Sequence, residues 1–251
     1  RLAHLLFAWL GRVTRVRVGI TKTHLWHDVR DALRARVCEL HGAGAIHADH
    51  DLISLKEEEE ALVLGFNVSG ELREVRCRAL FACDGTRSRV RELSPDAPCL
   101  LDEGKSVWRG VAPAYDCSGT ATFYRDAARA SGLLVAAGRG GGTSWTVIAP
   151  VVPGRSETQN ESRARLRDAL PTRVDECLLD VIAESPLVIE NKLVTRDWSK
   201  PWASSLLRLA YLGDAAHPLR PTGEGTALAF EDAYTIGHLA RDSGGVGPEL
   251  M

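Results

Sequence analysis

The sequence predicts a mixed α/β (α+β) fold, in which parts of a doubly wound domain enclose an inserted, mostly antiparallel sheet. Two apolar stretches, 79–83 and 206–212, each run into an adjacent glycine and aspartate and are followed by the start of a helix. Between them, residues 106–152 contain short apolar runs separated by Gly, Ser and Asp, which is typical of antiparallel strands. Because strand-to-helix signals lie on both sides of this sheet-rich middle, we expect the sheet to be an insertion.

The composition is that of an ordinary soluble globular protein, since 45% of the 251 residues are hydrophobic and 25% are charged. A formal net charge of −2 gives no reason to expect nucleic acid or an anionic membrane as the main partner. The six cysteines form no CxxC pair or zinc-type cluster, so we expect reduced thiols in a cytosol-like compartment and no metal. The apolar residues 2–10 are too few to span a bilayer. We expect them to form a buried segment of a larger protein rather than a signal-peptide core.

The first elements along the chain are a strand and a helix. Alternating apolar and polar residues over 15–20 predict a half-buried strand. Residues 23–41 predict a helix with Thr23 as N-cap and Gly42 as C-cap. The apolar stripe expected on this helix comprises Leu25, Val29, Leu33, Val37 and Leu40.

A meander of short strands is expected next. Residues 45–55 and 61–68 indicate two strands, and the acidic run 57–60 between them indicates a solvated hairpin tip. Gly70 marks another turn, and 79–83 is a short buried strand that ends at an aspartate and a glycine.

The second half of the chain predicts the sheet, two helices and a return to strand and helix. The glycine-rich loop 138–142 lacks the spacing of a phosphate-binding loop and precedes a strand, so we expect a hairpin loop. The remaining expected elements are helices 159–170 and 174–184, strands 186–196 and 206–212, and a helix over 225–241.

The stretch 211–233 carries the strongest chemical signal. Its strand runs directly into Gly213 and Asp214, a loop with two prolines and two glycines follows, and a helix opens at Gly225. This order places one carboxylate at a strand end and several free backbone N–H groups at a helix N-terminus, facing the same space. Such an arrangement binds a polar, partly anionic cofactor.

A second motif spans Asp84 to Arg91 and indicates a strand, a sharp turn and the first turn of a helix. Asp84 can cap that turn, and Ser88 and Arg91 can face the same side of it. The planar fork of Arg91 suits a phosphate or a carboxylate. Alone, this motif is typical of many surface turns.

Together, and in this order, the two motifs resemble those of the FAD-dependent aromatic hydroxylases, the single-component group A flavoprotein monooxygenases. The segment from Asp84 through Arg91 matches that family's DGxxSxVR pattern, and Gly213 through Ala233 matches its GDAAHPxxPxxGxGxxxAxEDA pattern. The WRG at 108–110 also resembles the entry to the family's substrate sheet.

The resemblance implies how the cofactor is held. Asp214 is expected to hydrogen-bond a ribityl hydroxyl of FAD, and the N–H groups near 223–226 to face the flavin N1/O2 edge. Asp84 and Arg91 are expected near the pyrophosphate and the path of the nicotinamide cofactor. The implied cofactor-binding residues are Asp84, Gly85, Ser88, Arg91, Gly213, Asp214, Pro221, Gly223, Gly225 and Thr226; no catalytic residue is assigned.

His217, Glu231 and Asp232 are expected to be structural, with His217 holding the loop and the two acids fixing the helix. By the same resemblance, residues 1–100 and 201–251 are the two parts of the FAD-binding domain. Residues 101–200 are then the substrate-binding sheet domain.

The resemblance also implies the chemistry. NAD(P)H reduces FAD, the reduced flavin captures O₂ as a C4a-hydroperoxide, and one oxygen atom is transferred to the substrate. The substrate is expected to be a small organic molecule, aromatic or polycyclic, that is hydroxylated or epoxidised. Its pocket is expected along the sheet at 106–152 and 187–196.

The sequence departs from the family pattern at three points. It contains no strand–GxGxxG–helix unit, which holds the ADP half of FAD in the family. Trp26 stands where the family has an arginine, and the loop Pro221–Gly225 is one residue shorter than the common form. A non-catalytic fragment or degenerate homologue that does not bind flavin alone is therefore an open alternative. A related halogenase or reductase is another, because residues 144–148 partly match a halogenase WxWxIP segment.

Overall fold

The computed structural model of this chain describes residues 14–17, 26–94, 99–113, 120–125, 131–136, 142–152, 158–170, 176–197, 199, 203, 208–221, 223–242 and 244. The chain divides into two compact units. The sheet unit comprises Arg1–Gly42 and Gly104–Leu193, and the site unit comprises Ala43–Glu103 and Val194–Met251. The predicted domains 1–100, 101–200 and 201–251 stay a proposal.

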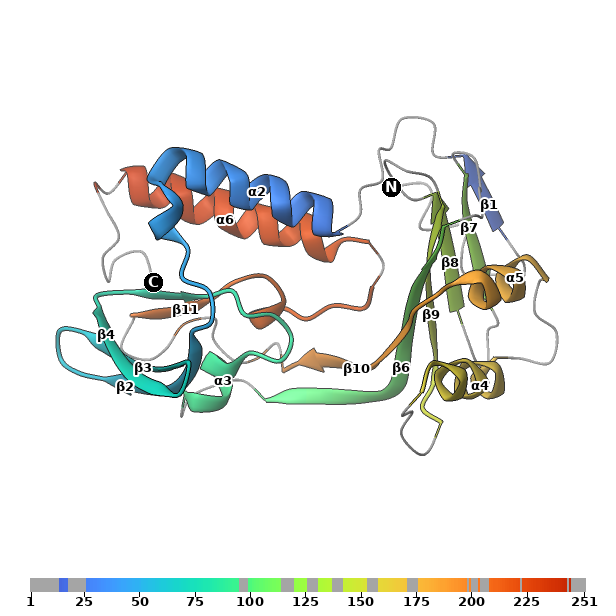
Figure 1. The fold of residues 1–251 in the computed structure, drawn as a ribbon, viewed down its shortest axis with the longest axis horizontal. Helices are drawn as coiled ribbons and strands as arrows, with labels where there is room; N and C mark the ends of the chain where they lie inside the picture. The colour runs from blue at the N-terminus through green and yellow to red at the C-terminus, as the bar shows by residue number, and fades with distance from the viewer. Residues whose placement is uncertain are drawn as a thin grey trace. The chain divides into compact units, whose positions relative to one another are not determined.

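The sheet unit is built on six strands: β1 (Thr14–Arg17), β6 (Leu100–Ala112), β7 (Thr120–Arg125), β8 (Ser131–Ala136), β9 (Thr143–Pro150) and β10 (Val188–Arg196). Their order in the sheet is β1-β7-β8-β9-β6-β10 (Figure 1). The pairs β1–β7, β7–β8, β8–β9 and β6–β9 are all antiparallel. The prediction of a mostly antiparallel sheet is therefore confirmed, and so is the mixed α/β class.

Helices α4 (Gln159–Ala169) and α5 (Glu176–Glu184) cover one face of this sheet (Figure 1). Alternate residues of β9 are buried, as the pleat requires of a strand with one covered face. The indole of Trp145 donates a 2.7 Å hydrogen bond to the Ser185 hydroxyl, which donates to the Val181 carbonyl at 2.8 Å. The core consists of Trp108, Ala112, Trp145, Val147, Ala149, Leu166, Ala169, Leu178, Val181, Ile182 and Val188.

Helix α4 begins with a capping box. The Thr158 hydroxyl accepts the Glu161 N–H at 3.2 Å, and the Glu161 carboxylate accepts the Thr158 N–H at 3.1 Å. This exchange satisfies two donors that a helix start otherwise leaves unpaired. The helices predicted at 159–170 and 174–184 are confirmed.

The site unit contains an antiparallel meander of β2 (Asp51–Glu57), β3 (Leu62–Val68) and β4 (Glu71–Cys77). Ser69 and Gly70 join β3 to β4 with φ values of 53° and 92°, the paired positive angles that suit a two-residue hairpin. The strand predicted from residue 45 is wrong over 45–50, because Asp49 has a φ of 58°, outside the extended region. Strand β4 was not predicted, since charged residues on both faces hide its alternation.

The same unit contains a parallel pair, β5 (Leu80–Ala82) and β11 (Leu209–Tyr211). Short helical segments follow each strand: α3 (Arg89–Leu93) after β5, and the 3₁₀ turn η2 (Gly213–Ala215) after β11. The core of the unit comprises Leu62, Ala82, Val90, Leu209, Tyr211, Ala215 and Ala216.

Two longer helices, α2 (Trp26–His41) and α6 (Gly225–Asp242), confirm the predictions for 23–41 and 225–241. The Gly42 N–H bonds the Cys38 carbonyl at 2.8 Å and Gly42 has a φ of 82°, so the predicted C-cap is present. Neither helix buries a residue. The expected apolar stripe of α2 is thus partly exposed, with Leu33, Val37 and Leu40 all accessible.

Predictions for residues 2–10, 18–20, Thr23, Leu25 and 138–141 fall outside the described residues. Across the described ranges, no helix is long and apolar enough to cross a membrane. The part of the chain that the structure describes also holds no group of three metal-ligating side chains. Cys38, Cys77, Cys83 and Cys99 are free thiols.

Candidate functional site

The parallel pair β5–β11 brings the two sequence motifs together. Leu80, Phe81 and Ala82 lie opposite Leu209, Ala210 and Tyr211, and the Leu212 N–H extends the ladder with a 2.9 Å bond to the Ala82 carbonyl. Carboxyl ends of parallel neighbours leave a sheet at the same edge, where ligands of open α/β sheets bind. The loops that begin at residues 83 and 212 therefore emerge side by side.

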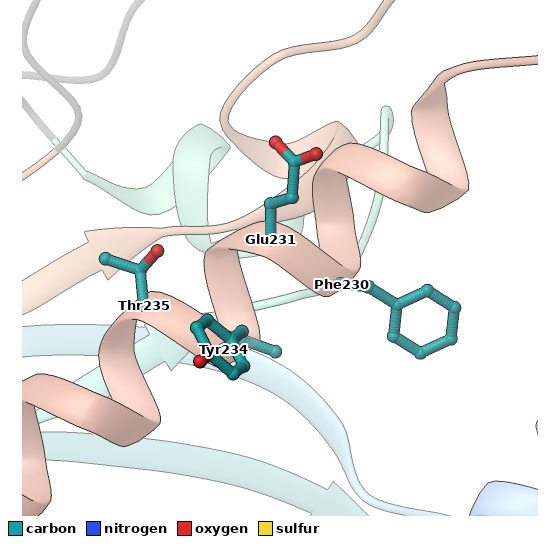
Figure 2. A pocket seen from close by; sticks show the side chains of 5 residues that line it. Phe230, Glu231, Tyr234 and Thr235 are labelled. Carbon is teal, nitrogen blue, oxygen red and sulfur yellow. The ribbon is translucent and has the colours of Figure 1, made fainter.

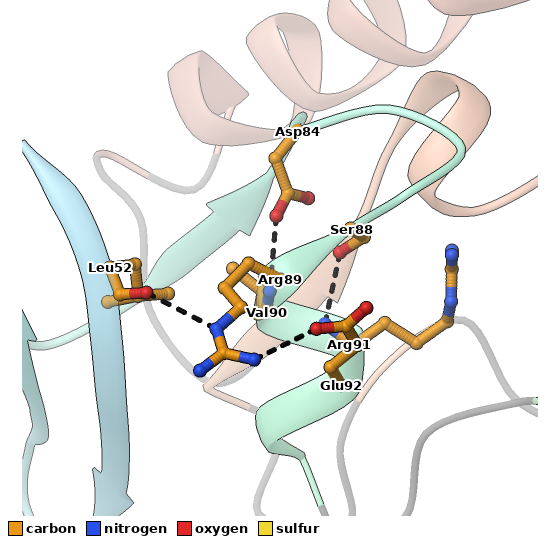
Figure 3. Close-up of polar contacts among 7 residues, drawn as sticks. All are labelled: Leu52, Asp84, Ser88, Arg89, Val90, Arg91 and Glu92. Atoms are coloured by element: carbon orange, nitrogen blue, oxygen red, sulfur yellow. Dashed lines mark hydrogen bonds and ion pairs between the residues drawn. The ribbon is translucent and has the colours of Figure 1, made fainter. Parts of the chain in front are cut away.

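The first motif folds as predicted (Figure 3). The Asp84 carboxylate accepts the Val90 N–H at 3.1 Å, and the Ser88 hydroxyl accepts the Arg91 N–H at 3.0 Å. Ser88 is the N-cap of α3 and is fully buried. Arg89 connects the same turn to strand β2 of the meander, because its side chain donates a hydrogen bond to the Leu52 carbonyl at 3.4 Å. The prediction that Asp84 caps this turn is confirmed.

The Arg91 guanidinium is directed at backbone carbonyls. It donates to the Ala215 carbonyl at 2.8 Å and to the Thr86 carbonyl, so it links the first motif to the turn η2. Arg91 is only 6% exposed, and this burial lowers the pKa of its guanidinium. The expected contact of Arg91 with a phosphate stays a prediction.

Arg196 is a site residue that sequence reasoning missed. It lies at the end of β10, is fully buried, and donates to the Ala216 carbonyl at 2.8 Å. Burial, and then the charge of Arg91, lower the pKa of the Arg196 guanidinium. Two guanidiniums thus bind consecutive carbonyls of one turn. Buried arginines are rare. Nothing in the sequence pattern of β10 distinguishes Arg196 from an exposed arginine at the end of a strand.

Asp214 presents an exposed carboxylate where the two motifs meet. One of its oxygens accepts the Thr86 hydroxyl at 3.3 Å. The other lies 3.6 Å from the position that a Cβ on Gly225 would occupy, at the first residue of α6. The structure therefore joins Asp214, the Thr86 loop and the N-terminus of α6, as the sequence motifs predicted.

Three glycines keep the backbone open at this place. Gly85 and Gly223 have φ values of 79° and 99°, and among the described residues, apart from the chain neighbours, no atom lies within 4 Å of the position that a Cβ would occupy. Gly213 has a φ of 55°, and a Cβ there would lie 3.3 Å from the Ala229 Cβ on α6. The first two positions leave room for a ligand against the backbone, while Gly213 allows the close contact of η2 with α6.

Asp232 and His217 connect η2 to the middle of α6. One Asp232 oxygen accepts the Gly213 N–H at 2.7 Å and lies 2.7 Å from His217 Nε2. These contacts agree with the expectation that His217 holds the loop and that Asp232 has a structural role. Glu231, on the same helix, is exposed.

The loop after His217 is attached at one further point. Arg220 donates to the Glu103 carboxylate at 2.8 Å through Nε, and this bond raises the pKa of Arg220. Pro218 is fully buried and Pro221 is half-buried. Thr226 is exposed in the first turn of α6.

A hollow lies along α6 (Figure 2). It is lined by Phe230, Glu231, Ala233, Tyr234 and Thr235, and none of these is a predicted cofactor residue.

Comparison with known proteins supports the family that the two motifs indicate. Residues 25–244 match the family model of the FAD binding domain. Asperlicin C monooxygenase from Petromyces alliaceus is 27% identical over 203 residues, which are 70% of this chain and 43% of that protein. The phenazine 1,6-dicarboxylic acid hydroxylase PhzS from Lysobacter antibioticus is 26% identical over 196 residues, 66% of this chain and 44% of that protein.

A solved structure shares the fold. HpxO from Klebsiella pneumoniae, complexed with FAD and uric acid, superposes with a TM-score of 0.65 at 20% sequence identity. The match covers 84% of this chain and 54% of that one. The chain thus spans less than half the length of the two related enzymes and about half of the solved structure.

Proposed function

Since this chain belongs to the FAD binding domain family, we propose that its site unit binds the flavin half of FAD at the edge formed by Asp214, the Thr86 loop and the start of α6. We further propose that the protein is an FAD-dependent monooxygenase of a small organic substrate. The observation that carries this proposal is the exposed Asp214 carboxylate beside a helix N-terminus, with open backbone at Gly85 and Gly223.

The residues of this edge suit a flavin and its ribityl chain. A carboxylate is a strong acceptor for hydroxyl donors, and Asp214 is exposed enough to accept one. At this end of α6 the Leu228 N–H donates to the Glu224 carbonyl at 3.0 Å. The first N–H groups of a helix have no acceptor within the helix itself, so those at the start of α6 suit an electron-rich ligand edge.

When bound, FAD supplies the redox chemistry that activates O₂ for oxygen transfer. The chain's own part is to orient the group and to stabilise its charge. Asp214 accepts a ribityl hydroxyl, and the N-terminus of α6 stabilises negative charge at the N1/O2 edge without reorganisation. Asp84 and Ser88 hold the first motif in place, and Arg91 holds η2, through the bonds described above.

The resemblance to the aromatic hydroxylases is the basis of the proposed electron donor, and the relatives support the proposed substrate class. We propose NAD(P)H as donor, O₂ as second substrate, and an aromatic or polycyclic substrate. The names of the two related enzymes contain asperlicin C and phenazine 1,6-dicarboxylic acid, and HpxO was solved with uric acid. These three are ring compounds, which supports that substrate class.

A second function is favoured by specific observations: a homologue that keeps the fold and does not bind flavin by itself. The sequence contains no strand–GxGxxG–helix unit, and Trp26, where the family has arginine, is 67% exposed on α2. In that case residues outside this chain complete the cofactor site.

Titration of the purified chain with FAD separates the two functions. We expect quenching of flavin fluorescence, and we expect Asp214→Asn to weaken binding by about tenfold, or about 1.4 kcal/mol. Asp242→Asn, an exposed acid at the far end of α6, is the matched control and should change nothing. A chain that shows no flavin absorbance and no quenching overturns flavin binding and supports the second function.

A further inference from the structure

We propose that Asp232 is the positioning residue of the flavin site: through one carboxylate oxygen it holds Gly213 and His217 together, and so fixes the turn that presents Asp214. This inference rests on the proposed function for the identity of its ligand. The positioning role itself is argued from the geometry of the turn.

The Asp232 oxygen Oδ2 serves two partners at the same distance. It accepts the Gly213 N–H at 2.7 Å and lies 2.7 Å from His217 Nε2. A carboxylate oxygen is an acceptor, so Nε2 carries the hydrogen of the second bond. Hydrogen bonds to an ionised acceptor are shorter and stronger than neutral ones.

The backbone of the turn closes on the same glycine. The Gly213 carbonyl accepts the N–H groups of Ala216 at 2.9 Å and of His217 at 2.8 Å. Gly213 is thus held at its N–H by Asp232 and at its carbonyl by the turn. His217 is held twice, at its backbone N–H and at its ring. The Asp214 side chain between these two held residues is exposed, and it accepts the Thr86 hydroxyl at 3.3 Å.

The turn η2 approaches α6 closely at Gly213. A Cβ on Gly213 would lie 3.3 Å from the Ala229 Cβ, so the turn is already near its limit of approach at this φ of 55°. Ala229 and Asp232 are three residues apart and lie on the same face of α6. The helix therefore leaves little room for a side chain at Gly213 and orients this residue by one hydrogen bond.

Burial protects the arrangement from water. The His217 side chain is 4% exposed and that of Asp232 is 17% exposed, whereas Asp214 is exposed. One partly buried acid thus orients a neighbouring exposed acid. Loss of Asp232 should change ligand affinity although this residue touches no ligand.

The experiment compares variants of the full chain by two readouts: FAD titration, and amide hydrogen exchange over residues 211–217. Asp232→Ala removes both bonds, so we expect FAD affinity to fall by about tenfold or more and exchange at Gly213 and His217 to accelerate. Asp232→Asn retains an oxygen that can accept both bonds, and we expect most of the affinity to be kept. Glu231→Gln, an exposed acid on the same helical turn, is the matched control and should leave both readouts unchanged.

A rescue experiment excludes a general loss of folding. His217→Ala should weaken FAD binding, and His217→Gln should restore it, because the glutamine amide nitrogen can donate from the place of Nε2. If Asp232→Ala also accelerates exchange in β3, which lies in the core of the same unit, the two His217 variants decide the question. Equal affinity for all His217 variants then overturns the proposal.

The remaining outcomes are separate. Wild-type affinity in Asp232→Ala, or unchanged exchange at Gly213, overturns the positioning role. Absence of FAD binding by the wild-type chain contradicts the proposed function instead. In that event the rates of amide exchange at Gly213 and His217 alone decide whether Asp232 fixes the turn.

Discussion

Helices α4 and α5 of the sheet unit and helix α6 of the site unit are held in different ways. Helices α4 and α5 bury Leu166, Leu178 and Val181 against the sheet. Helix α6, whose first turn belongs to the candidate site, buries no residue and is joined to η2 by the Asp232 hydrogen bond, at a place where a Cβ on Gly213 would lie 3.3 Å from Ala229. Burial of apolar area is non-directional, whereas hydrogen bonds specify the position of single atoms. The difference indicates that apolar burial holds α4 and α5, whereas a polar contact sets the position of α6 at η2.

The buried arginines extend the same contrast. The core of the sheet unit contains two tryptophans and aliphatic residues. In the site unit, Arg91 and Arg196 occupy buried positions and bind the carbonyls of Ala215 and Ala216. We expect the stability of this turn to fall more when a hydrogen-bond donor is lost than when side-chain volume is lost.

The largest effect is expected from Trp145→Ala in the sheet unit. Removing this fully buried ring should lower the free energy of unfolding by about 3–5 kcal/mol, as measured by urea denaturation. Hydrogen exchange at residues 211–217 should keep its native pattern at low denaturant. Loss of protection in the turn that equals the loss in β9 would contradict a separation between the two units.

A smaller loss is expected from Arg196→Met in the site unit. The change leaves the buried Ala216 carbonyl without this donor, and an unsatisfied buried acceptor costs about 1–3 kcal/mol. Relief from the charge of Arg91 offsets part of this loss. The measurement is urea denaturation together with exchange at His217. Arg196→Lys keeps a donor, so its free energy of unfolding should lie between those of the wild type and the Met variant. A Met variant as stable as the wild type would contradict a supporting role of Arg196.

The two N-cap residues allow a matched test in the two units. Ser88→Ala and Thr158→Ala each remove a side-chain acceptor from a helix start and should each lower stability by about 1 kcal/mol. Only Ser88→Ala should also weaken FAD binding, because Ser88 fixes the backbone of Arg91. Equal effects of the two variants on FAD affinity would contradict the assignment of α3 to the site.

The smallest effect is expected from Arg220→Ala. Arg220 is 58% exposed, so its pair with Glu103 should contribute about 0–1 kcal/mol. Thermal unfolding at low and at high salt provides the measurement, and added salt should remove most of the difference. A large loss of stability that persists in salt would show that the loop depends on this pair.

Much of the fold could be predicted because its signals are local. Short apolar runs between Gly, Ser and Asp predicted the antiparallel sheet, the apolar stripe and Gly42 predicted α2 and its end, and helices were also expected where α4, α5 and α6 lie. Strand β4 could not be predicted, because its charged residues do not alternate. The strand expected over 45–50 was wrong, since the positive φ of Asp49 depends on neighbours that the pattern does not include.

The sequence by itself determined the two motifs, their order and the bond of Asp84 to the first turn of α3, because Asp84 and Val90 lie only six residues apart in the chain. The family also follows from these motifs. Only the tertiary structure decided that β5 and β11 are neighbours, that Arg196 supports the same turn as Arg91, and that Asp232 holds Gly213. Those contacts join residues from separate elements. The side chains that make them are ordinary in their local sequence, and their energies depend on burial that arises when the chain has folded.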